Sequence, residues 1–171
     1  MLKRLTRCEL IQLLDTIAER YALQVPQLLV DGTRQLGCYD SGELSLSGEQ
    51  LQRKPTSYFF PQTELMLSID SAGTVCPPPV SRKPLALFGL DRTDLTAIAF
   101  LDRFFLAPPA DDIYQRRRQG ALLIGLTGYS GGSGSFLPLA KVNCDFELIA
   151  TDDGWLAAAY SATGKNLLEG F

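Results

Sequence analysis

The chain has 171 residues, of which 46% are hydrophobic and 20% are charged, and it contains no histidine. This length and apolar content predict one globular domain over 1–171, which can divide into a hairpin-rich part, 1–80, and a second part, 81–171. The net charge of −3 argues against a nucleic-acid-binding protein, and the longest apolar run, 85–90, is too short to insert into a membrane.

A helix is predicted over 7–22. Thr6 and Glu9 form the pattern of a capping box, and apolar side chains then recur at helical spacing. Two hairpins follow, the first around Asp31-Gly32, with a polar connection over 41–57 between them that has room for one short helical turn. The predicted strand pairs are 27–30 with 35–39 and 65–69 with 74–76.

The second half predicts a β-α-β unit. The apolar runs 85–90 and 121–126 suit strands that are buried on both faces, and a helix capped by Asp91 or Thr93 lies between them. A third hairpin is predicted from 145–149 and 155–160. The predicted fold class is therefore mixed α/β or α+β, with an N-terminal helix, several β-hairpins and one central β-α-β unit in a mixed sheet.

The residue types present limit the chemistry of this chain. Without histidine, the serine, cysteine and zinc sites that depend on an imidazole are excluded. The four cysteines form no Cys-x-x-Cys and are interpreted as reduced thiols of a cytoplasmic protein. The paired aspartates are interpreted as helix caps and turn residues. We therefore predict no metal site and no catalytic residue, which favours a non-enzymatic role for this chain alone.

One candidate site is the glycine-rich loop 125–135, which leaves the end of a buried strand, where open α/β sheets bind ligands. It matches neither a dinucleotide-binding motif nor a P-loop, so a loop without a ligand remains the alternative. Asp94, Tyr114 and Arg117 are predicted neighbours, and Arg118 extends a basic run that suits an anion or a protein partner. The loop residues predicted to bind are Thr127, Gly128, Tyr129, Ser130 and Gly131.

Four segments resemble, in order, the N-terminal region of the sulfhydrogenase β-subunit and anaerobic sulfite reductase A-subunit family. They are 54–64, 88–94, 111–118 and 145–165, so the likeness spans most of the chain. The most specific part is Phe-Phe-Pro-Gln-x-Glu over 59–64. Its family-motif residues are Phe60, Pro61, Gln62 and Glu64.

The resemblance implies an iron–sulfur electron-transfer subunit, in which an α/β region precedes a module that binds [4Fe–4S] clusters. The cysteines of that family are absent, because Thr93, Thr127 and the glycines and serines after it stand where relatives have thiols. A cluster would then require a longer natural chain or a partner to supply the ligands.

Three functions remain open from the sequence. The first is a cofactor-free accessory, assembly or docking domain that binds protein subunits of a redox complex. The second is a protein or enzyme that binds a nucleotide, a flavin or another small anion through the loop 125–135. The third is an N-terminal fragment of a longer iron–sulfur oxidoreductase subunit.

Overall fold

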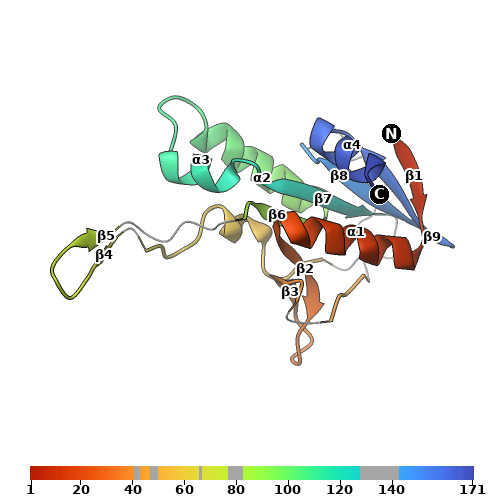
Figure 1. Cartoon of the computed structure of the whole chain (residues 1–171), viewed down its shortest axis with the longest axis horizontal. Coiled ribbons are helices and arrows are strands. Elements are labelled where there is room, and N and C mark those ends of the chain that lie inside the picture. The colour runs from red at the N-terminus through yellow and green to blue at the C-terminus, as the bar shows by residue number, and fades with distance from the viewer. Residues whose placement is uncertain (41–42, 47–49, 66, 77–82, 128–142) are drawn as a thin grey trace.

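The structure is a computed structural model that describes the chain except for residues 41–42, 47–49, 66, 77–82 and 128–142 (Figure 1). Seven strands form one mixed sheet in the order β1-β9-β8-β7-β6-β2-β3. The strands are β1 Leu2–Leu5, β2 Ala22–Leu28, β3 Arg34–Cys38, β6 Leu85–Leu90, β7 Leu122–Thr127, β8 Phe146–Thr151 and β9 Gly154–Ala159. The helices are α1 Arg7–Arg20, α2 Arg92–Phe105, α3 Asp112–Arg118, α4 Ala162–Glu169 and the 3₁₀ helix η1 Pro55–Tyr58.

The mixed α/β fold class is confirmed. Strands β2, β6, β7 and β8 are parallel neighbours, and the antiparallel strands β3, β9 and β1 complete the sheet. The predicted β-α-β unit is β6-α2-β7, and two further parallel pairs extend it on either side. Strands from both 1–80 and 81–171 therefore belong to one sheet.

The helices cover both faces of the sheet, and each face has its own core. On the face of α1 and α4, the core is built mainly from aliphatic residues and includes Leu10, Leu14, Ile17 and Leu168. On the face of α2, α3 and η1, the core is partly aromatic and includes Phe59 and Tyr114. We call the first the α1/α4 face and the second the α2/α3 face.

A β-bulge in β6 sends two neighbouring apolar residues to opposite faces. Phe88 packs on the α1/α4 face and Leu90 on the α2/α3 face, although alternation alone would place both on one face. The residue between them, Gly89, has a φ of 82°, and a Cβ there would overlap Pro26 Cγ. Glycine is therefore required at the point where β6 turns into α2.

Asp145 joins the end of the chain to the sheet. Its carboxylate accepts hydrogen bonds from the Leu123 amide at 2.8 Å and the Ser161 hydroxyl at 2.6 Å, and Ser161 in turn caps α4. Gly164 lies so close to the Asp145 carbonyl that a Cβ would overlap it. Asp145 and Gly164, both in the last of the resembling segments, thus act together in the packing of α4.

Local structure follows the sequence predictions with a few differences. Helix α1 ends at Arg20, two residues before the predicted end, and Asp91 rather than Thr93 caps α2. The second hairpin forms the short strands β4 Ser68–Ile69 and β5 Val75–Cys76, at the far end of the molecule from the seven-stranded sheet (Figure 1). The described residues contain no helix that is both long and apolar enough to cross a bilayer.

Candidate functional site

Three of the four segments that carry the family resemblance, 54–64, 88–94 and 111–118, meet on the α2/α3 face. Tyr114 on α3 is buried, and its hydroxyl donates to Asp102 Oδ1 on α2 at 2.7 Å. Arg118 Nε donates to both oxygens of the same carboxylate at 3.0 Å, and its guanidinium lies over the Phe59 ring at 5.5 Å. These contacts fix α3 to α2 and to the 59–64 segment.

A second ion pair links the 59–64 segment to α3. Arg117 donates to both carboxylate oxygens of Glu64, and its guanidinium also reaches the Phe59 carbonyl. Two residues that the resemblance singled out separately therefore bind each other across the fold. Arg117 and Arg118 are both engaged within the chain, so neither is a bare cation offered to a ligand.

Asp94 has a structural place at the start of α2. It completes the capping box with Asp91 and lies 3.4 Å from Lys54 Nζ, while its own side chain is only 1% exposed. Burial, and then the nearby Asp91 carboxylate, raise the pKa of Asp94 to about 6, because both disfavour its charged form. The nearby Lys54 ammonium lowers the pKa of Asp94 in part, because it favours the charged carboxylate.

An aromatic chain runs from the core of the α2/α3 face to its surface. The buried rings of Phe59 and Tyr114 lie 6.3 Å apart, and Phe105 stacks on Tyr114 at 5.0 Å and on Phe60 at 4.8 Å. Phe104 contacts Phe105 edge to face at 5.0 Å. The chain thus passes from fully buried rings to rings in contact with solvent.

The outer end of that chain forms an exposed aromatic patch. Phe60 is 54% exposed, Phe104 is 69% exposed, and Phe100, one helical turn from Phe104, is 65% exposed. Three large rings on one short stretch of surface exceed the scattered single apolar residues that a protein surface normally carries. We call Phe60, Phe100 and Phe104 the aromatic patch.

The other predicted site residues are not among the three rings of this patch. Pro61 is half-buried and Gln62 is exposed in the same segment. Thr127 is the last residue of β7, where it pairs with Ile149. The rest of the predicted loop site lies outside the described residues, namely Gly128, Tyr129, Ser130 and Gly131.

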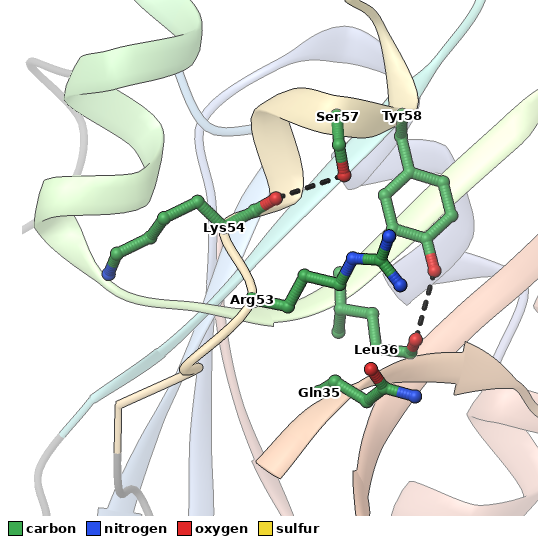
Figure 2. A pocket seen from close by; sticks show the side chains of 6 residues that line it. All are labelled: Gln35, Leu36, Arg53, Lys54, Ser57 and Tyr58. Carbon is green, nitrogen blue, oxygen red and sulfur yellow. Dashed lines mark hydrogen bonds between the residues drawn. The ribbon is translucent and has the colours of Figure 1, made fainter. Parts of the chain in front are cut away.

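A shallow pocket of about 150 Å³ lies between β3 and η1, and sequence reasoning missed it (Figure 2). Lys54 lies in a resembling segment, but nothing local shows that Gln35 comes to lie beside it. The pocket is lined by Gln35, Leu36, Arg53, Lys54, Ser57 and Tyr58.

The described residues offer no ligand set for a metal ion or an iron–sulfur cluster. No three cysteine, aspartate or glutamate side chains among them are grouped so that they could hold a metal. Cys144 is buried beside the Phe146 carbonyl, and burial raises the pKa of its thiol to about 12, so it stays protonated at neutral pH. A buried, protonated thiol does not suit cluster ligation.

Comparison with known proteins gives one informative match. No protein-family profile matches the chain, and no solved structure matches it. Over 86 residues the chain is 30% identical to the sulfhydrogenase 2 subunit beta of Pyrococcus furiosus. The match supports a distant relationship to the family of that subunit. It includes 48% of this chain and 26% of the relative, so the chain spans about a quarter of the length of the protein it matches.

Proposed function

We propose that this chain is a cofactor-free accessory domain that docks on a protein subunit of a cytoplasmic redox complex related to sulfhydrogenase. The observation that carries the proposal is the aromatic patch, in which Phe60, from a resembling segment, and Phe104 both contact Phe105. The distant relative is itself named a subunit, and this supports a role in assembly rather than alone.

The surroundings of the patch favour one kind of partner surface. Arg103 and Arg116 are exposed on α2 and α3, and neither takes part in the ion pairs of the described residues. Aromatic side chains and arginine are the residue types enriched at the centre of protein interfaces. The complementary surface is therefore apolar at its centre and acidic at its rim.

The stability of the patch also supports docking. Phe105, which stacks on the buried Tyr114, contacts both Phe60 and Phe104, so these two rings have less side-chain freedom to lose when a partner binds. Any [4Fe–4S] clusters in the proposed complex belong to the partner or to sequence outside these 171 residues, because the described cysteines offer no ligand set.

Co-purification from the native host tests this function. The tagged chain is compared with the double variant Phe100→Ser/Phe104→Ser and with the control Leu28→Ser/Val30→Ser, which removes exposed apolar side chains from the β2–β3 hairpin instead. We expect the native chain and the control to recover an iron–sulfur oxidoreductase subunit, and the α2 variant to lose it. Equal recovery by all three, or recovery of no such subunit, contradicts the proposal.

A further inference from the structure

The pocket between β3 and η1 gathers two cations, of which Lys54 is paired with Asp94 and Arg53 has no carboxylate partner among the described residues. Arg53 and Lys54 contribute two positive charges, and none of the six lining residues is acidic. Arg53 takes part in no hydrogen bond or ion pair with another described residue. A guanidinium that points into a concave surface, and that no carboxylate in the described part of the chain neutralises, is suited to an anion.

The remaining lining supplies shape and neutral hydrogen-bonding groups. Figure 2 shows the Arg53 guanidinium between the Tyr58 ring and the Gln35 amide, over the side chain of Leu36. Tyr58 is fixed there, because its hydroxyl donates to the Leu36 carbonyl at 3.0 Å and lies 3.1 Å from Gln24 Oε1. Because this hydroxyl is already engaged, Arg53 and Gln35 are the donors left for a ligand.

Lys54 is positioned as an adjustable third donor. Its ammonium extends away from Tyr58 toward α2, where it lies 3.4 Å from Asp94 Oδ1, longer than the usual charge-assisted hydrogen bond of about 2.7–2.9 Å (Figure 2). Its side chain is 48% exposed and can therefore move. An ammonium carries three donors, and Asp94 uses one of them.

We propose that this pocket binds a phosphate group, held by the Arg53 guanidinium, the Gln35 amide and the Lys54 ammonium. Two cations and an amide match the several oxygens and the double negative charge of a phosphate better than they match a carboxylate, which has two oxygens and a single charge. The pocket is large enough for one such group and shallow enough to leave an ester substituent in solvent.

The site does not depend on the proposed docking function. Its residues belong to β3 and to the segment that begins η1, whereas the aromatic patch lies on α2 and at Phe60. Loss of phosphate binding with intact co-purification would therefore reject the pocket alone. Loss of co-purification with intact phosphate binding would reject docking alone.

A nuclear magnetic resonance titration of the full chain with inorganic phosphate tests the site, at constant ionic strength set by chloride. We expect saturable amide shifts around Gln35, Arg53 and Ser57, and we expect Arg53→Met to weaken binding by about tenfold or more, as for loss of a charged hydrogen bond. The matched control is Arg4→Gln, an exposed arginine on β1 at the opposite edge of the sheet, which should bind like the native chain.

Two further probes define the ligand. Adenosine monophosphate tests a phosphate ester: tighter binding than inorganic phosphate points to a phosphorylated metabolite, and equal binding to free phosphate. Acetate tests a carboxylate, and saturation by acetate at the same concentration overturns the assignment.

The proposal is also overturned if Arg53→Met leaves the phosphate titration unchanged, or if Arg4→Gln weakens it equally. A second variant, Gln35→Leu, should weaken binding while retaining both cations.

Discussion

The two faces of the seven-stranded sheet differ in whether their helices expose large apolar side chains. The α1/α4 face is packed mainly with aliphatic side chains, and neither α1 nor α4, both fully described, exposes a large apolar residue. The α2/α3 face also has a mainly aliphatic core, but charged pairs join its segments and α2 exposes Phe100 and Phe104. One face is closed and serves stability. The other joins a core to an open surface, which is where binding can occur.

Most of the resembling segments contribute to the α2/α3 face, although the segment 145–165 contributes Phe146 and Leu148 to the α1/α4 face. The segments 54–64, 88–94 and 111–118 all contribute to the α2/α3 face, through Lys54 with Asp94 and through Glu64 with Arg117. Their charged residues hold helices and loops together over long sequence separations. These three segments therefore build the frame of the α2/α3 face.

The largest expected effect is from Phe59→Ala, which removes the buried ring beneath the α2/α3 face. Phe59 is fully buried and contacts Tyr114 and Arg118, so we expect the free energy of unfolding to fall by about 3–5 kcal/mol. Urea unfolding followed by circular dichroism measures this. Ile17→Val on the α1/α4 face is the reference variant, with an expected loss of about 0.5–1.5 kcal/mol. A loss no larger than that of Ile17→Val would show that the Phe59 ring contributes little to the core of the α2/α3 face.

Breaking the charged network should have the next largest effect. Arg118→Met leaves the Asp102 carboxylate with Tyr114 but without its cation, and we expect a loss of roughly 3 kcal/mol, the lower end for a buried pair, since both side chains keep slight exposure. The double variant Arg118→Met/Asp102→Asn should recover part of that loss. A double variant that is no more stable than Arg118→Met would show that the pair contributes through packing alone.

The raised pKa of Asp94 predicts that the stability of the α2/α3 face depends on pH. Its pKa is raised from 3.8 to about 6 in the folded chain, so the folded state holds this proton more tightly than the unfolded state. The resulting stabilisation is complete below about pH 4 and is lost as the pH rises through about 6, a change of about 2–3 kcal/mol. Asp94→Asn should remove this component from unfolding curves measured between pH 4 and 7. An unchanged pH dependence in the variant would contradict it.

The smallest expected change in stability is at the aromatic patch. Phe100→Ser and Phe104→Ser alter exposed side chains, and each should change the free energy of unfolding by no more than about 0.5 kcal/mol. Thermal unfolding of the two variants checks this. A loss above about 2 kcal/mol would show that these rings support the core rather than present a surface.

Local patterns in the sequence predicted much of the fold, and long-range contacts account for what they missed. The Thr6 and Asp91 caps, the apolar runs of β6 and β7 and the turn before β9 are all signals within a few residues. Strand β1 has only four residues and is defined by pairing with β9, at the other end of the chain. Helix α4 is short and packs through Gly164, which is a poor helix former.

The candidate sites also depend on contacts between residues that are far apart in sequence. The basic residues Arg117 and Arg118 were predicted as a binding surface, but carboxylates 53 and 16 residues away in sequence engage them. The pocket beside Arg53 depends on Gln35 from a separate hairpin. No spacing rule connects such residues, because the sheet order brings them together. The sequence could not predict the aromatic patch, because it does not show which phenylalanine rings are exposed.

Photo-crosslinking in the native host tests the central claim most directly. The photoreactive residue p-benzoylphenylalanine is placed at position 104, in the aromatic patch, and separately at position 30, on the β2–β3 hairpin, where Val30 is fully exposed. Docking through the α2/α3 face predicts crosslinks from position 104 to an iron–sulfur oxidoreductase subunit and none to that subunit from position 30. Crosslinks to such a subunit from position 30 alone, or from neither position, would contradict the account.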